Sequence, residues 1–110
     1  MQDESAFVAL TERVLAAIGA ALDAVENDDL DWSENDGVLT IDCGAGGRII
    51  VNRHVVNREV WVAAKSGGFH FRAESGAWKD TRSGEELSAA LQRLLQEQGG
   101  AAVEFPPLPA

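Results

Sequence analysis

The chain has 110 residues, of which 18 are acidic and 9 are basic, so its formal net charge is −9. This length suits a single domain, and a hydrophobic content of 45% is enough for a folded core, which argues against intrinsic disorder. A strongly acidic protein is repelled by phosphate backbones and anionic lipids, so we expect neither nucleic acid nor membrane as a partner.

The single cysteine, Cys43, excludes an intramolecular disulfide, which is typical of a reducing compartment. The N-terminal sequence lacks the basic and then apolar segments of a secretory signal. No apolar run approaches the roughly 18 residues that a membrane span needs. We therefore expect a cytoplasmic protein, and its high charge favours a monomer.

The first predicted element is an amphipathic helix over residues 4–25. Its apolar residues recur every three or four positions and form one stripe: Phe7, Leu10, Val14, Ile18, Leu22 and Val25. Asp3 is the expected N-cap. Asp23 and Glu26 fall at the C-terminal end, where the helix dipole disfavours negative charge, so their position suggests a functional reason.

The middle of the chain is predicted to form an antiparallel sheet joined by hairpins. Asp36-Gly37 is a hairpin signal between a short strand at residues 30–34 and a strand at residues 38–43. Glycine-rich turns then separate four further predicted strands, at residues 48–52, 58–65, 69–73 and 77–80.

A second helix is predicted to end the domain. Ser83 and Glu86 have the spacing of a capping box at its start, and Gly99-Gly100 stop it. Its buried stripe consists of leucines: Leu87, Leu91, Leu94 and Leu95. The order predicts an α+β two-layer sandwich, with both terminal helices packed on one face of an antiparallel sheet of five to seven strands. The single domain covers residues 1–105, and the Pro-rich tail, residues 106–110, is expected to fray.

The negative charge is concentrated in the first part of the chain. Residues 1–47 carry eleven acidic side chains and one basic, and seven of those carboxylates lie within residues 23–36. Carboxylates are hard ligands that suit Fe²⁺, Mn²⁺, Ca²⁺ or Mg²⁺ with poor selectivity. An EF-hand is excluded, because Glu34 and Thr40 stand where its glycine and its glutamate belong. The alternative is a solvated acidic face without a metal.

Strand alternation predicts that Val60 and Val62 face the helices and that Trp61 lies on the open face of the sheet. An exposed tryptophan suits a binding hot spot, and the alternative is a half-buried structural residue. His70 is expected to point outward and His54 to lie in a loop, both as surface histidines. Cys43 is expected to be a buried strand residue.

One segment carries a family resemblance. The sequence VNRHVVNREVWVAAKSGGFHF, residues 51–71, resembles the frataxin family in its bacterial CyaY branch. The GVLTI segment at residues 37–41 and the Trp-x-Asp at residues 78–80 support the resemblance, which runs in order through residues 4–105. It implies a frataxin-like fold and a non-enzymatic, iron-binding adaptor or regulator of iron–sulfur cluster assembly. Such a protein binds Fe²⁺ or Fe³⁺ weakly on an acidic ridge and docks on a cysteine desulfurase–scaffold complex.

The resemblance also implies site residues. The metal ridge falls on Asp23, Glu26, Asp28, Asp29 and Asp31. The partner-binding positions fall on Glu34, Asn52, Arg53, Glu59 and Trp61. Val56 and Glu59 stand where the family usually has proline and glutamine. Two alternatives stay open: an iron-storage or iron-delivery metallochaperone with ferroxidase activity and metal-induced oligomers, and an acidic interaction domain with no metal role.

Overall fold

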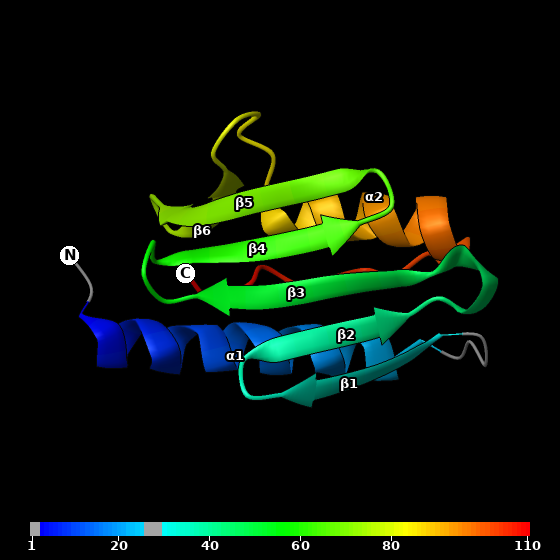
Figure 1. The fold of residues 1–110 in the computed structure, drawn as a ribbon, viewed down its shortest axis with the longest axis horizontal. Coiled ribbons are helices and arrows are strands. Elements are labelled where there is room, and N and C mark those ends of the chain that lie inside the picture. The colour runs from blue at the N-terminus through cyan, green and yellow to red at the C-terminus, as the bar shows by residue number, and fades with distance from the viewer. Residues whose placement is uncertain (1–2, 26–29) are drawn as a thin grey trace.

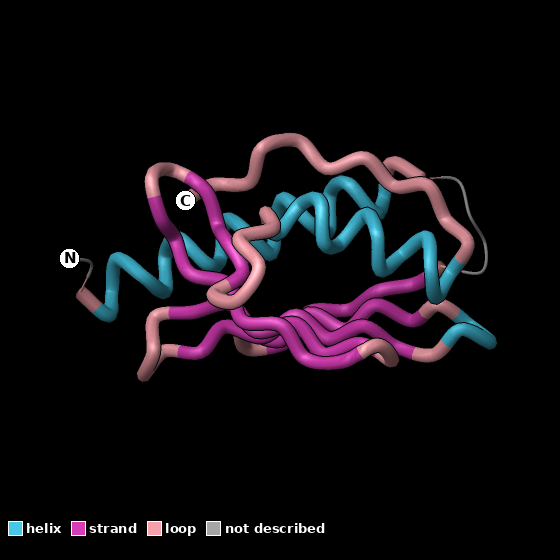
Figure 2. The backbone as a smooth tube through the Cα atoms, turned by 90° about the horizontal axis from the view of Figure 1, so that it is seen from above, coloured by secondary structure: helices cyan, strands magenta, loops and turns pink. Residues whose placement is uncertain are grey.

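Six antiparallel strands form one sheet in their order along the chain, and two helices lie on one of its faces (Figure 1). The computed structural model describes residues 3–25 and 30–110. The strands are β1 (Asp31–Asn35), β2 (Val38–Asp42), β3 (Arg48–His54), β4 (Glu59–Ala64), β5 (Gly67–Glu74) and β6 (Ala77–Asp80). In Figure 2 the helices α1 (Glu4–Asp23) and α2 (Leu87–Gly99) make one layer over the sheet, which confirms the predicted two-layer α+β sandwich.

Strand alternation places the core between the two layers. Every second residue of the central strands faces the helices, and seven of these residues are at most 1% exposed: Leu39, Ile41, Ile49, Val51, Val60, Val62 and Phe71. The helices meet them with Phe7, Val14, Ile18, Leu91 and Leu94, all fully buried. Burying each such side chain stabilises the fold by roughly 1.5–3 kcal/mol. The described chain places no helix on the other face of the sheet.

Helix α1 begins as predicted and ends two residues earlier. The Asp3 carboxylate accepts a hydrogen bond from the backbone N–H of Ala6 at 2.7 Å, which makes Asp3 the N-cap. The last helical residue is Asp23. The mean hydropathy of α1 reaches 1.6, which by length and composition alone would suit a membrane span. Its apolar stripe is instead buried against the sheet.

The predicted capping box at the start of α2 is wrong. The helix begins at Leu87 after Glu86, whose side chain makes no cap hydrogen bond. The reason lies in the preceding turn, which Asp80 organises. Its carboxylate accepts a hydrogen bond from the backbone N–H of Arg82, and its own backbone N–H donates to the carbonyl of Glu85. The backbone of Glu86 is extended and forms a β-bridge with Lys79 of β6. Glu86 is therefore not in the first helical turn, where a capping box would need it to bond with Ser83.

The Pro-rich tail packs on the domain and does not fray as expected. Leu108 of the tail is half-buried against the core, and the residues that lead into it, Ala101 and Val103, are buried. The buried indole of Trp78 donates a hydrogen bond from Nε1 to the carbonyl of Pro109 at 2.5 Å. In Figure 2 this segment crosses the outer side of the helix layer, so the tail closes that side of the core.

Removal of residues 107–110 should lower the free energy of unfolding by about 1–3 kcal/mol, because the buried Trp78 N–H loses its acceptor. Urea denaturation followed by tryptophan fluorescence measures this change. A control that lacks only Ala110 keeps the hydrogen bond and should unfold like the full chain. Equal stability of the longer truncation would contradict the packing role of the tail.

Candidate functional site

The uncovered face of the sheet carries one row of side chains that crosses four strands. Val38, Asn52, Trp61 and His70 are direct neighbours across β2, β3, β4 and β5. Trp61 is half-exposed, whereas its sequence neighbours on the other face are 1% exposed. The predicted alternation around Trp61 is therefore confirmed.

Two histidines enclose the tryptophan. The rings of His54 and Trp61 stack at a centroid distance of 3.8 Å and an angle of 10°. The rings of Trp61 and His70 stack at 4.2 Å and 5°. We call these three residues the aromatic ladder. The outward position predicted for His70 is confirmed, but His54 is the last residue of β3 and not a loop residue, because β3 continues two residues beyond its predicted end.

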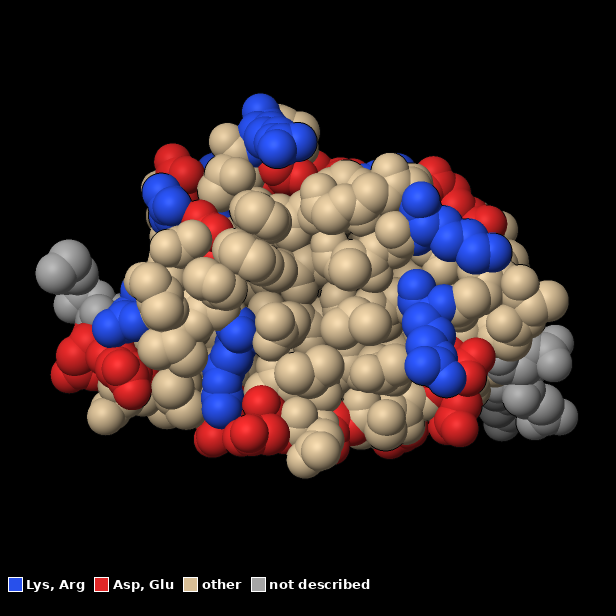
Figure 3. Space-filling view, viewed as in Figure 1, with Lys and Arg blue, Asp and Glu red and all other residues tan. Residues whose placement is uncertain are grey.

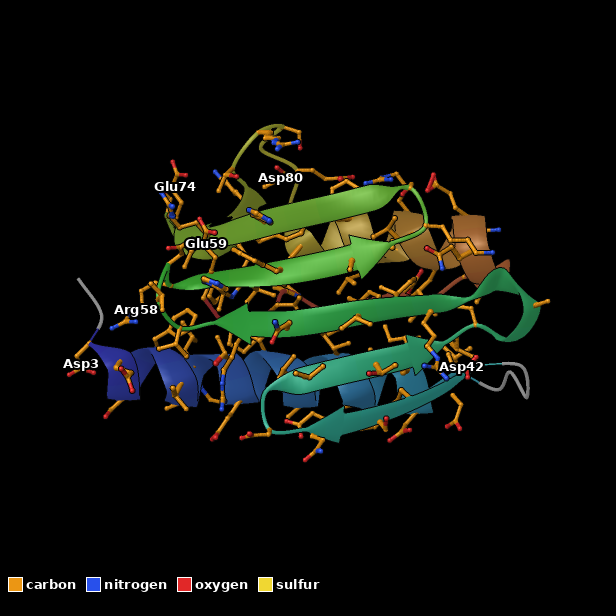
Figure 4. The ribbon with its side chains drawn as sticks, in the orientation of Figure 1. Asp3, Asp42, Arg58, Glu59, Glu74 and Asp80 are labelled. Carbon is orange, nitrogen blue, oxygen red and sulfur yellow. The ribbon has the colours of Figure 1, made fainter. Side chains whose placement is uncertain are left out.

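A buried carboxylate anchors the ladder. Glu59 is 4% exposed although it lies at the start of β4 (Figure 4). Its Oε1 accepts a hydrogen bond from Trp61 Nε1 at 2.8 Å, and its Oε2 accepts one from Arg72 Nη2 at 2.6 Å. Burial alone would raise the pKa of Glu59, but these two hydrogen bonds and the charges of Arg72 and His70 outweigh it and lower that pKa. Glu59 is therefore an ionised support of Trp61.

The remaining predicted partner-binding residues, Asn52, Arg53 and Glu34, lie in different parts of the structure. Asn52 is half-buried beside Trp61 on the uncovered face. Arg53 points toward the helix layer, where its guanidinium lies 3.8 Å from Glu12 of α1 and 4.0 Å from Asp36 of the first hairpin. Glu34 is exposed on the edge strand β1. The structure thus brings Asn52, Glu59 and Trp61 together and leaves Arg53 and Glu34 apart from them.

Of the predicted metal ridge, the structure describes Asp23 and Asp31, while Glu26, Asp28 and Asp29 lie outside the described residues. Asp23 and Asp31 are both exposed. Within residues 3–25 and 30–110, no three histidine, cysteine or acidic side chains converge as a metal site would require. The described carboxylates therefore offer single hard oxygen ligands and no closed cage.

Trp32 supports this ridge in a way that sequence reasoning missed. Its Nε1 donates a hydrogen bond to Asp23 Oδ1 at 2.7 Å. Its ring lies so close to Gly19 of α1 that an added Cβ atom would stand 2.6 Å from it. A side chain at position 19 would displace the Trp32 ring. Gly19 therefore allows Trp32 to hold the Asp23 carboxylate at the end of α1.

Charge is divided between an edge and a face of the molecule. In Figure 3 acidic side chains follow the edge formed by α1 and β1, and basic side chains flank a largely uncharged sheet face. The strand registers place Arg48 and Arg72 on that face, toward opposite ends of its strands. Unlike charges are therefore presented on two adjoining surfaces.

Two further features offer no separate site. Cys43 is buried as predicted, although it lies one residue beyond the end of β2 and not in the strand. Burial, together with the charge of Asp42, raises the pKa of its thiol. A cleft of about 610 Å³ lies beside His70, at the turn that precedes α2. Its charged groups are largely paired with one another: Arg93 binds Glu85 at 3.0 Å, and Asp80 binds the turn backbone.

The chain matches known proteins over most of its length. The family model of the frataxin-like domain matches residues 1–101. A protein of Dechloromonas aromatica is 47% identical over 92% of this chain and 96% of its own length. One of Burkholderia mallei is 44% identical over 90% and 94%. Both carry the name iron–sulfur cluster assembly protein CyaY.

Solved structures show the same fold. Frataxin from Psychromonas ingrahamii superposes with a TM-score of 0.88 at 26% identity, over 96% of this chain and 99% of that one. Trimeric frataxin from Saccharomyces cerevisiae, complexed with ferrous iron, superposes with a TM-score of 0.68 at 22% identity, over 92% and 89%. The yeast structure is similar in fold alone.

Because the pKa of Glu59 is lowered, we expect Glu59→Gln to reduce the free energy of unfolding by an amount that depends on pH. At pH 7 the variant should lose about 1–3 kcal/mol of unfolding free energy, because the charged hydrogen bond with Arg72 is removed. The folded pKa lies below the unfolded value of about 4.3, so the ionised carboxylate stabilises the fold fully above that pH. This contribution is lost as the pH falls through the folded pKa.

Urea denaturation of both proteins from pH 7 down to pH 3 tests this prediction. The stability difference should be constant near neutrality and should close in acid. Glu74→Gln, at an exposed position of β5, is the control and should change stability little at any pH. A difference that persists undiminished at pH 3 would show that the charge of Glu59 is not what stabilises the fold.

Proposed function

The chain belongs to the frataxin-like family, and from this we propose that it acts in iron–sulfur cluster assembly as a non-enzymatic adaptor in the cytoplasm. It docks on the cysteine desulfurase–scaffold complex and regulates cluster synthesis. Support comes from relatives at 44–47% identity that carry the name iron–sulfur cluster assembly protein. The observation that carries the proposal is the uncovered sheet face with Trp61 at its centre, since a half-exposed tryptophan in a fixed position suits a binding hot spot.

In this proposal each of two surfaces contacts a different partner protein. The acidic edge, which includes Asp23 and Asp31, attracts a basic patch of the desulfurase and accelerates the encounter. The sheet face around Trp61 contacts the scaffold protein. Because the two surfaces adjoin, one molecule can contact both proteins of the complex at once.

Iron is proposed as a regulatory ligand of the ridge and not as a resident cofactor. Single carboxylates bind Fe²⁺ or Fe³⁺ weakly and do not exclude other divalent cations. The ridge of the proposal comprises Asp23, Glu26, Asp28, Asp29 and Asp31. A metal ion and the desulfurase would use the same carboxylates, so iron occupancy and docking would influence each other.

Electrostatic docking predicts a strong salt dependence. Affinity for the desulfurase should fall steeply between roughly 50 and 500 mM NaCl, because exposed charges are screened over this range. The double variant Asp23→Asn/Asp31→Asn should bind more weakly at low salt and show a shallower dependence. The control Glu74→Gln/Glu104→Gln removes two exposed carboxylates elsewhere and should keep the wild-type slope. An affinity that is flat across this range would contradict electrostatic docking.

The sheet-face contact predicts the behaviour of Trp61→Arg. The variant should bind the desulfurase–scaffold complex at least about tenfold more weakly, as hot-spot replacements do. Its melting temperature should change little, because the core lies on the other face of the sheet. Calorimetric titration and thermal unfolding measure both quantities, and a variant that unfolds would favour a structural role for Trp61.

A cluster-assembly assay with desulfurase and scaffold, run across Fe²⁺ concentrations, separates the adaptor from an iron store. The adaptor should change the rate of cluster formation, and Trp61→Arg should remove that effect. Iron uptake into growing oligomers that is indifferent to Trp61 would instead support iron storage.

A further inference from the structure

The C-terminal arm, residues 101–110, is held on the domain mainly by its side chains. It forms neither helix nor strand. Beyond Ala101, the only hydrogen bond between the arm and the rest of the described chain is the one that Trp78 Nε1 donates to the carbonyl of Pro109. Four apolar side chains of the arm are buried or half-buried against the core: Ala101, Val103, Phe105 and Leu108. The arm is therefore a docked segment whose backbone is not paired into the fold.

Three prolines suit the arm to docking as one piece. Pro106, Pro107 and Pro109 have no backbone N–H, so an extended path over the helices leaves few donors without a partner. Their rings also hold φ at about −65° in the free arm. The free arm is consequently less variable, and less conformational entropy is lost when it docks. Such an arm docks at little entropic cost on whichever copy of its groove it meets.

The groove beneath the arm is unfavourable when it is empty. Trp78 is 2% exposed, so its indole N–H would be buried without an acceptor if Pro109 left. Pro107 and Leu108 line a small cleft together with Leu87 of α2, and the apolar surface of that cleft would then meet water. A departing arm must therefore be replaced by a segment with the same shape and the same carbonyl. The arm of a second copy of this chain is such a segment.

A glycine hinge sets the direction of the arm. Gly100 has a φ of 60°, in the left-handed region, and its backbone N–H donates to the carbonyl of Gln96. This turn sends the arm back across the outer side of the helix layer (Figure 2). Glycine adopts other backbone conformations as readily. A change at Gly99 and Gly100 alone would therefore direct the arm away from its own domain and leave the rest of the fold as it is.

The end of the molecule at which two hinges would meet has balanced charge. The side chain of Gln98 bonds with the backbone of Lys65 and of Arg48, so these two basic residues lie at the end of α2. Glu97 lines a cleft with Lys65, and Asp42 is the direct cross-strand neighbour of Arg48. Close approach of two copies at this end therefore brings no large charge of one sign together. The repulsion between two net charges of −9 acts at longer range and is screened by salt.

We propose that two copies of this chain exchange their C-terminal arms, so that Trp78 of each copy bonds with Pro109 of the other. Reciprocal exchange closes the assembly at two copies and keeps every contact of the arm, with only the hinge changed. The dimer forms by mass action at high protein concentration, and the monomer prevails in dilute solution. Because the arm lies on the helix side, the uncovered sheet face of each copy stays free in the dimer.

Refolding from urea at different protein concentrations tests the exchange. Light scattering after size-exclusion chromatography should find a dimer after refolding at about 1 mM and a monomer at about 10 µM. The dimer fraction should rise between roughly 50 and 500 mM NaCl, because salt screens the repulsion between the copies. Gly100→Ala should raise the association constant at least about tenfold, since exchange removes alanine from a left-handed conformation in both chains. Gly84→Ala is the matched control, also at positive φ with space for a Cβ atom, and should associate like the wild type.

An isotope-filtered NOE identifies the arm as the exchanged element. In a dimer refolded from an equal mixture of ¹⁵N-labelled and unlabelled chains, the indole N–H proton of labelled Trp78 should show an NOE to Pro109 of the unlabelled chain. A chain without residues 107–110 should stay monomeric under the same conditions, and circular dichroism verifies that each variant is folded.

Three results would overturn the exchange. One is a dimer without this NOE, and another is a truncated chain that dimerises as well as the full chain. The third is the absence of a dimer from both the wild type and Gly100→Ala after refolding at the higher concentration.

Discussion

The rest of the structure depends on one constraint, which is that both described helices pack against the same face of the sheet. Alternation then assigns every strand residue either to the core or to the uncovered face, and Val60 and Trp61 are separated in this way. The uncovered face must hold its side chains in place without a second layer. Here an ion pair between the buried Glu59 and the exposed Arg72 and a stack of three rings perform that role.

The division of charge follows from the order of the elements. The acidic first part of the chain includes α1 and the edge strand β1, so the carboxylates of these two elements lie along one edge of the molecule. Strands β3 and β5 contribute Arg48 and Arg72 to the face beside that edge. One small domain thereby presents two surfaces of different character, as an adaptor between two proteins requires. Trp32 of β1 holds the carboxylate of Asp23 at the end of α1 on the acidic edge.

Local signals predicted the fold well. Asp36-Gly37 was sufficient for the first hairpin, where both residues adopt the positive φ values that its turn requires. What the sequence could not show depends on neighbours from other elements. Burial of Glu59 results from Trp61 and from Arg72 of the next strand, and the capping box failed because Asp80 organises the preceding turn. His70 could have been grouped with Trp61 by alternation, whereas His54 required the true end of β3.

Chemical-shift mapping of the ¹⁵N-labelled protein on addition of the desulfurase–scaffold complex tests the central claim most directly. The account predicts that the perturbed signals belong to Asn52, Trp61 and His70 on the sheet face and to Asp23 and Asp31 on the acidic edge. Signals from the exposed side of α2, such as that of Gln96, should stay unchanged. Perturbations confined to α2 would contradict the claim that the uncovered face and its acidic edge are the docking surface.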